Sequence, residues 1–224
     1  MRASHCLPAL AALTLAGCDA ASASTDDLPS AAAVAADTAR DNRLTRADLG
    51  RIAGQESAPV WLVVISDFQC PFCKRWHEET GPRIEREFVR SGKVRIAYLN
   101  LPISTHRNAP PAHEAAMCAA EQGRFWPVAD AIFATQDAWK SRRDAVLYFD
   151  SLSVPLVDDA ARFRRCIVEG GTRALIDADV QRVTRLGVGS TPTFLVGPQV
   201  IVGAQPYEVF RDVLNAAVAA AAQR

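Results

Sequence analysis

Two cysteines separated by two residues, Cys70 and Cys73, are the side chains of this sequence best suited to covalent chemistry. They lie in the stretch SDFQCPFCKRW, residues 66–76, directly after an apolar run and before a segment with helical spacing. Such a pair is compatible with half of a zinc site, with a permanent structural disulfide, or with a disulfide that opens and closes during a reaction. The rest of the chain has to distinguish these interpretations.

The N-terminus has the pattern of an export signal. Arg2 precedes a short apolar run over residues 6–15, which is too short to span a bilayer as a helix, and two small residues then lead to Cys18. The ending LAGC, residues 15–18, resembles the lipobox of bacterial lipoproteins, and this resemblance implies that residues 1–17 are removed and that Cys18 is lipidated. The alternative is an ordinary signal peptide or a transmembrane anchor, in which Cys18 has no role.

Composition limits what the rest of the chain can be. With 224 residues, 49% of them hydrophobic, the chain can bury one good core. Residues 18–46 are rich in Ala, Ser, Thr and Asp, so we expect a flexible tether there. Removing residues 1–17 takes Arg2 from 25 basic residues and leaves all 25 acidic ones, so the mature net charge is about −1. The sequence has no basic stripe of the kind that binds nucleic acid.

The predicted export determines how the remaining cysteines are interpreted, because disulfides persist in the oxidising cell envelope. Cys70, Cys73, Cys118 and Cys166 are the cysteines left in the body of the chain. Zinc is disfavoured because Cys118 lies forty-five residues beyond Cys73, far outside the spacing of a zinc ribbon. We therefore expect no metal site.

Hydrophobic patterning predicts a strand, a helix and a second strand around the cysteine pair. The β-branched run within residues 58–68 is typical of a buried central strand. Residues 70–91 have helical spacing, with a kink expected at Gly81-Pro82 because proline removes a backbone donor. Residues 93–101 alternate as in a second strand. If the two strands are parallel, the connection between them is a right-handed crossover.

The middle of the chain, residues 108–187, has no strand pattern and predicts four or five helices, the first of them capped by Asn108. Two short strands at residues 193–196 and 199–203 then form a hairpin, and a helix begins at Pro206. The order is β-α-β, a helical block, and α-β-β-α. This order predicts an α/β protein with a thioredoxin fold and an inserted helical subdomain.

With these elements in place, residues 47–222 resemble the DsbA-like thiol-disulfide oxidoreductases of the thioredoxin superfamily. SDFQCPFCK resembles their active-site turn, AAMCAAEQGRFW the start of a helical insertion at about residues 104–170, and LGVGSTPTFLVG a loop with a cis-proline. The resemblance implies that the Thr191–Pro192 bond is cis, and that this loop packs against the cysteine pair and binds extended substrate. The alternative is an ordinary trans proline at the start of a strand.

The position of the cysteine pair predicts a division of roles. Cys70 is expected at the N-cap of a helix that begins at Pro71, where free N–H groups and the helix dipole lower the pKa of the thiol. Cys70 is therefore the expected nucleophile, and the more buried Cys73, one turn later, closes or resolves the disulfide. The ring of Phe72 contacts substrate in this interpretation, or else packs only against its own domain.

Cys118 and Cys166 are the two cysteines left over in the helical block. We predict a second, structural disulfide between them, which would close a loop of nearly fifty residues. Two buried free thiols, or a redox relay to Cys70 and Cys73, are the alternatives.

One position departs from the family pattern. The resemblance implies a buried acid six residues before the nucleophile, but Val64 stands there, so the proton acceptor for the buried cysteine is open. Asp67 lies nearer in the sequence and is a candidate, although it equally suits a turn cap. His77, His106 and His113 are expected to be surface or packing residues.

These features together predict an envelope thiol-disulfide oxidoreductase, acting most simply as an oxidase through Cys70 and Cys73. A reductase or isomerase is the nearest alternative, and a non-catalytic lipoprotein that binds polypeptides is an alternative of another class. We expect exported proteins with free thiols or disulfides as substrates, a membrane protein as redox partner, and a monomer that faces the periplasm and is anchored through Cys18. No organic cofactor or metal is required.

Overall fold

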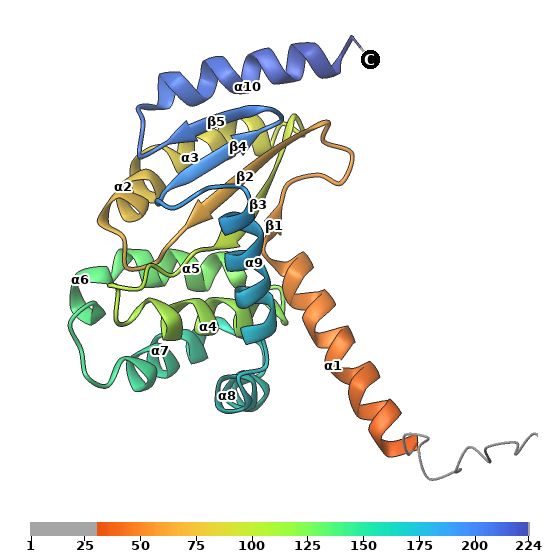
Figure 1. The fold of residues 1–224 in the computed structure, drawn as a ribbon, viewed down its shortest axis with the longest axis vertical. Coiled ribbons are helices and arrows are strands. Elements are labelled where there is room, and N and C mark those ends of the chain that lie inside the picture. The colour runs from red at the N-terminus through yellow and green to blue at the C-terminus, as the bar shows by residue number, and fades with distance from the viewer. Residues whose placement is uncertain (1–30, 224) are drawn as a thin grey trace, which may run out of the picture.

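The apolar run after Pro59 forms β2 (Val60–Ser66), the middle strand of a five-stranded sheet (Figure 1). The strand order is β1-β3-β2-β4-β5, with β1 Ile52–Ala53, β3 Val94–Asn100, β4 Thr193–Val196 and β5 Gln199–Val202. β2 is parallel to β3 and antiparallel to β4, and β4 and β5 form a hairpin. The predicted crossover and hairpin are confirmed, while the short edge strand β1 was not predicted.

The structure is a computed structural model that describes the backbone of residues 31–223 and the side chains of residues 40–223. The predicted signal peptide, residues 1–17, and Cys18 lie outside the described residues. Within the described part, no helix is both long enough and apolar enough to cross a membrane.

Alternating side chains of β2 pack the sheet against helices on both faces. Val60, Leu62 and Val64 point to one face, where they join a core with the helices that follow β2 and with the last helix. These helices are α2 (Pro71–Glu79), α3 (Gly81–Ile84), the π-helix η2 (Glu85–Val89) and α10 (Tyr207–Ala221). Ile65 points to the other face and packs with Val183 of α9 (Arg173–Arg185).

The expected kink between α2 and α3 is confirmed. α2 ends at Glu79, and α3 begins at Gly81 with Pro82 in its first turn. Because proline has no N–H to donate, the chain starts a new helix there instead of extending the old one.

The helical insertion lies between β3 and α9 and forms a second layer below the sheet in Figure 1. Its helices are α4 (Ala109–Ala120), α5 (Phe125–Ala134), α6 (Gln136–Trp139), α7 (Ala145–Ser153), the 3₁₀ helix η3 (Val154–Leu156) and α8 (Ala160–Glu169). α5 and α6 are separate helices because the first ends at Thr135, whose hydroxyl donates to the carbonyl of Ala131 at 2.7 Å.

The region predicted to be a flexible tether, residues 18–46, is helical from residue 31 onward. This helix, α1 (Ala31–Gly50), consists largely of alanine and other helix-forming residues, and its last turns pack on α4. Ala47 is fully buried, Arg43 pairs with Glu169 of α8 at 3.1 Å, and a Cβ at Gly50 would collide with the backbone of α4. The prediction was wrong for this segment because the residues that pack the helix on α4, Ala47 and Gly50, follow the polar, alanine-rich residues from which the tether was predicted.

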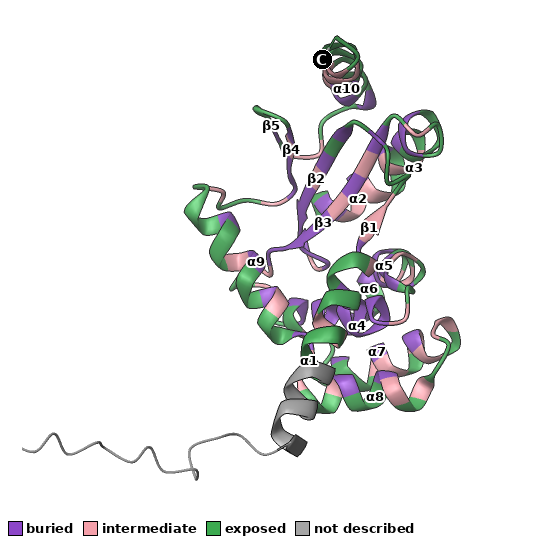
Figure 2. Ribbon diagram, turned by 90° about the vertical axis from the view of Figure 1, so that its right-hand side faces the viewer, coloured by how far each residue is buried: buried purple, intermediate pink, exposed green. Residues whose placement is uncertain are grey.

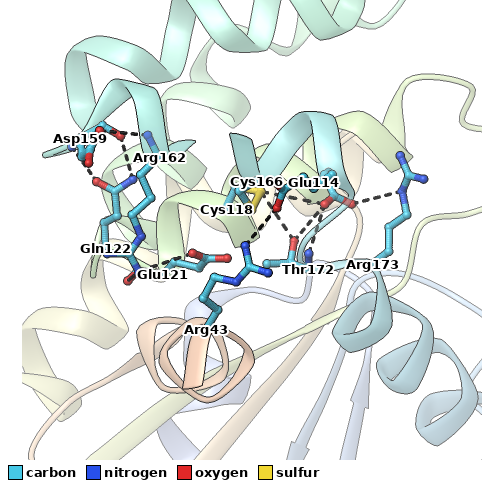
Figure 3. The surroundings of a disulfide bond; sticks show 11 residues. Arg43, Glu114, Cys118, Glu121, Gln122, Asp159, Arg162, Cys166, Thr172 and Arg173 are labelled. Carbon is cyan, nitrogen blue, oxygen red and sulfur yellow. Dashed lines mark hydrogen bonds and ion pairs between the residues drawn. A yellow bond between two sulfur atoms is a disulfide. The ribbon is translucent and has the colours of Figure 1, made fainter. Parts of the chain in front are cut away.

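Cys118 of α4 and Cys166 of α8 form the predicted disulfide, with their Cα atoms 5.7 Å apart (Figure 3). Both cysteines are buried, and the carboxylate of Glu114 lies beside them. Glu114 accepts hydrogen bonds from the N–H and hydroxyl of Thr172, at 3.3 and 3.2 Å. The disulfide and these bonds tie α4, α8 and the start of α9 together.

We predict that removing this disulfide destabilises the protein without affecting the Cys70–Cys73 pair. The double variant Cys118→Ala/Cys166→Ala should lose about 4 kcal/mol of unfolding free energy, because the open loop of the unfolded chain gains conformational entropy. Urea unfolding under oxidising conditions measures this loss. In strong reductant the wild type loses the bond as well, and the difference should shrink. Equal stability of variant and wild type under oxidising conditions would contradict the prediction.

Candidate active site

The cysteine pair stands where β2 ends and α2 begins. Cys70 is the N-cap of α2, with extended backbone angles, and Pro71 opens the helix. The Cys70 N–H donates to the carbonyl of Asp67 at 3.1 Å, and its own carbonyl accepts from Lys74 N–H at 3.1 Å. The Cys70 sulfur therefore lies at the N-terminal, positive end of the α2 dipole, as expected for a stabilised thiolate.

The loop before β4 meets this turn. The Thr191–Pro192 bond is cis, as the resemblance implied, and the carbonyl of Thr191 lies 3.4 Å from the Cys70 sulfur. Residues far apart in sequence are thus brought to one place by the pairing of β2 with β4. Phe72, between the two cysteines in the sequence, is 54% exposed. Cys70 and the Thr191–Pro192 loop accordingly lie together, while a substrate contact of Phe72 stays a prediction.

Cys70 and Cys73 are both free thiols in this structure, and both are nearly buried, at 4% and 1% exposed. The expected contrast in exposure is therefore small, and the two sulfurs differ mainly in electrostatics. A hydrogen bond from Cys73, helped by the Thr191 side chain and the N–H groups of Cys73 and Phe72, lowers the pKa of Cys70 to about 6. Burial, and next the neighbouring Cys70, raise the pKa of Cys73 well above its ordinary value. Near neutral pH the pair therefore holds a thiolate at Cys70 and a thiol at Cys73.

Asp67 serves the turn, not the thiols. Its carboxylate is fully buried and accepts from the N–H of Gln69 and of Ile103, each at 2.7 Å. It also pairs with His106 Nδ1 at 2.7 Å. Only its backbone faces the pair, because the Asp67 N–H donates to the Cys73 sulfur at 3.5 Å. Of the two roles considered for Asp67, the structure supports the turn cap.

The helical insertion holds the same turn from the other side through Gln136, which the sequence did not single out, and Asn108, which was expected only to cap a helix. Gln136 of α6 donates to the carbonyls of Phe68 and Cys70, at 2.7 and 3.1 Å. The Gln69 side chain accepts from Asn108 N–H at 2.7 Å. The Asn108 side chain does not cap α4 as expected, but donates to the carbonyls of Trp139, at the end of α6, and of Arg142, each at 2.9 Å. These amides belong to no sequence motif. Gln136 reaches the turn because α5 ends at Thr135 and a new helix starts after it.

The remaining histidines are packing residues. His77 pairs with Asp130 at 2.8 Å at the surface. His113 is fully buried, and burial lowers its pKa to about 4, so it is neutral at physiological pH. It bonds Asn100 at 2.7 Å, and Asn100 in turn donates to the buried carboxylate of Asp179, which pairs with Arg51.

Comparison with known protein families identifies this arrangement. Residues 47–216 match the family model described as thioredoxin, which is more than half of the chain. The chain belongs to the thioredoxin family. The sheet order, the cysteine pair before a helix and the cis-proline opposite it are the features of this thioredoxin-family protein that define its site.

Curated relatives of this thioredoxin-family protein fall into two groups. It is 33% identical over 175 residues to "Na(+)/H(+) antiporter NhaA 3" of Salinispora tropica, covering 78% of this chain and 25% of that protein. It is 27% identical over 148 residues to "Probable disulfide bond formation protein D" of Bacillus cereus, covering 64% of this chain and 68% of that protein. The chain thus spans a quarter of the length of the first relative and about two thirds of the second.

Solved structures show the same fold. BdbD from Bacillus subtilis, in its oxidised form, superposes with a TM-score of 0.69 at 19% identity, covering 76% of this chain and 94% of that one. DsbA2 from Pseudomonas aeruginosa gives a TM-score of 0.59 at 24% identity, covering 74% and 92%. The fold of this thioredoxin-family protein is therefore DsbA-like, helical insertion included.

We predict that Cys70 titrates near pH 6 in the reduced protein, as measured by thiolate absorbance and by the pH dependence of alkylation with iodoacetamide. Because this pKa is lower when folded than when unfolded, the thiolate stabilises the reduced fold above the ordinary thiol pKa, and that stabilisation is lost as the pH falls through about 6. Cys70→Ser should remove the titration.

A matched pair of variants tests the cause. Cys73→Ala removes the hydrogen bond to the thiolate and should raise the pKa of Cys70, while Cys73→Ser keeps a donor and should raise it less. Equal values in the two variants would contradict the assigned cause.

Proposed function

We propose that this protein is a thiol-disulfide oxidoreductase of the cell envelope that works as an oxidase of exported proteins. The observation that carries the proposal is the place of Cys70, at the start of α2, with its thiolate stabilised and the Thr191–Pro192 loop beside it. The printed names of the Bacillus relatives, disulfide bond formation proteins, agree with this direction.

The reaction begins with the Cys70–Cys73 disulfide. A substrate thiolate attacks the Cys70 sulfur, so that a mixed disulfide forms and the electron pair of the broken bond goes to Cys73, which takes up a proton. A second substrate thiolate attacks the substrate sulfur of the mixed disulfide and expels Cys70 as a thiolate. The substrate gains a disulfide, and the enzyme is left as the dithiol, which a membrane protein reoxidises.

The electrostatics of the pair favour the oxidising direction. A thiolate with a lowered pKa is a good leaving group, and its stabilisation favours the reduced enzyme over the disulfide. A stabilised reduced form corresponds to a more oxidising disulfide, provided that the pH lies above the pKa of about 6 for Cys70. At lower pH this advantage declines as Cys70 is protonated.

The surface around Cys70 suits an extended polypeptide. The backbone next to Pro192 is the place where a substrate strand pairs in the resembling family, and Phe72, between the two cysteines in the sequence, offers an exposed apolar ring. Binding through backbone hydrogen bonds and one apolar contact is compatible with many substrate sequences.

The proposal includes a place in the cell. Lipidation at Cys18 would anchor the protein to a membrane with its body facing the periplasm.

The reduction potential of the Cys70–Cys73 pair, measured against glutathione, tests the direction of electron flow. We expect a value nearer to that of DsbA, about −120 mV, than to that of thioredoxin, about −270 mV. A value as reducing as thioredoxin's would overturn the oxidase assignment in favour of a reductase.

Activity assays separate an enzyme from a binding protein. Wild type should oxidise a reduced dithiol peptide, and Cys70→Ser should not. With the peptide supplied in its disulfide form, the Cys70 thiolate of Cys73→Ala should attack one peptide sulfur, expel the other as a thiolate, and accumulate as a mixed disulfide, because no Cys73 thiol is present to release it. Phe72→Ala should slow the oxidation of apolar peptides while leaving the reduction potential unchanged. If Cys70→Ser matches wild type in both redox and peptide binding, the protein is a non-catalytic binder.

Anchoring is tested separately with Cys18→Ala in the full-length chain. We expect the variant to move from the membrane fraction to the soluble periplasmic fraction, and metabolic labelling with palmitate to be lost. A Cys18→Ala protein that fractionates with the membrane like wild type would contradict lipidation.

A further inference from the structure

Arg75 lies on α2, one helical turn beyond Phe72, and connects this helix to the loop of the cis-proline. Its guanidinium lies over the Phe72 ring, 5.3 Å from the ring centroid, and donates to the carbonyl of Ala204 at 3.4 Å. Gly203 and Ala204 follow β5, where the chain passes beside α2 (Figure 1). The N–H of Gly203 in turn donates to the carbonyl of Pro192 at 2.8 Å. Arg75 therefore stands at the rim of the active site.

The two segments that Arg75 joins grow out of buried strands. β2 leads into the turn before α2, β4 follows Pro192, and both strands are mostly buried (Figure 2). The guanidinium is held on two sides, by the Phe72 ring and by the Ala204 carbonyl. An arginine that is already held in place loses less side-chain entropy when it binds a ligand.

Arg75 is the basic residue of α2 that has no ion pair among the described residues. The other two, Lys74 and His77, each pair with a carboxylate. Glu79 follows Arg75 by one turn, but the guanidinium lies over Phe72, on the N-terminal side, and makes no ion pair with it. A guanidinium has five N–H donors, and the Arg75 side chain gives one hydrogen bond. Because Arg75 is exposed, its other donors are available to a carboxylate from another molecule.

Helix geometry sets how far Arg75 lies from the nucleophile. Cys70 is the N-cap of α2 and Arg75 comes five residues later, which corresponds to about 7.5 Å along the helix axis. An extended chain advances about 3.3 Å per residue. A substrate that is bonded to Cys70 and extended along the Thr191–Pro192 loop therefore covers this distance within two or three residues of its own cysteine.

We propose that Arg75 determines specificity in thiol exchange by binding a carboxylate of the substrate, on an Asp or Glu two or three residues from the reacting cysteine. The planar guanidinium can bind both oxygens of one carboxylate. This inference rests on the proposed function and goes beyond it by naming a substrate class, polypeptides with an acidic residue near the cysteine. Because the contact is exposed to water, it modulates the rate and does not decide it alone.

Three dithiol peptides that differ in charge test this specificity. They carry Glu, Gln or Lys at the second and third residues on either side of one cysteine. The second-order rate constant of their oxidation by the oxidised full-length protein is measured at low ionic strength. The constant for the Glu peptide should be about three- to tenfold above that for the Gln peptide, and the Lys peptide should be the slowest. Added salt should reduce the difference, because it screens exposed charges.

Variants of two arginines identify the residue responsible. Arg75→Gln should abolish the difference between the Glu and Gln peptides, and Arg75→Lys, which keeps the charge but not the planar donors, should retain part of it. Arg83→Gln is the matched control and should retain the full difference. Arg83 is also exposed and stacks on an aromatic ring, that of Tyr207 at 3.7 Å, but it already pairs with Glu208 at 3.5 Å. An effect of the Arg75 charge on the Cys70 thiolate would instead change all three rates by one factor.

A binding measurement separates this inference from the proposed function. The same peptides with serine in place of cysteine are titrated into the protein, and the guanidinium Nε–H signals of Arg75 and Arg83 are followed by NMR. The Glu peptide should shift the Arg75 signal, leave the Arg83 signal in place, and bind about three- to tenfold more tightly than the Gln peptide.

Two results would overturn the inference: equal rates and affinities of the Glu and Gln peptides with wild type, or a preference for the Glu peptide that persists in Arg75→Gln. Peptides that bind with the expected preference but are not oxidised would overturn the proposed function and leave the carboxylate contact of Arg75 in place.

Discussion

The buried carboxylate of Asp67 is the interaction on which the site depends. A charge taken out of water is tolerated only when its oxygens are fully bonded, and here they receive the N–H groups of Gln69 and Ile103 and pair with His106. These partners come from the turn after β2 and the loop after β3, so one carboxylate joins the ends of two parallel strands. The sulfur of Cys70 takes its position from that join.

The helical insertion completes the site as well as the core. Gln136 holds the carbonyls of Phe68 and Cys70, and Asn108 holds Gln69 from the same layer. A second polar seam runs from Arg51 through Asp179 of α9 to Asn100 of β3, and His113 of α4 joins it to the insertion. A buried amide or carboxylate that is left without its partner costs free energy. These bonds therefore fix the position of the insertion on the sheet more narrowly than apolar contacts alone would.

The sequence was sufficient to predict a feature of the fold where a residue type favoured one local structure. Pro82 predicted a break in the helix, the continuous apolar run of β2 predicted a buried central strand, and Cys118 and Cys166 were the two cysteines left for a structural disulfide. It was insufficient where the outcome depended on distant partners. Asn108 was expected to cap α4 and instead binds carbonyls some thirty residues away, and the helical state of α1 rests on a last turn that packs against α4.

The pairing order of the disulfide has a consequence for how the chain matures. In the folded body, Cys70 and Cys73 are consecutive cysteines, and Cys118 is joined to the next cysteine along the chain, Cys166. A chain that grows from its N-terminus therefore presents Cys70 and Cys73 together, before either of the others exists to compete. Pairing in order of emergence gives the native connectivity, and no bond has to be broken and reshuffled. A protein proposed to make disulfides in others is thus arranged to acquire its own without an isomerase.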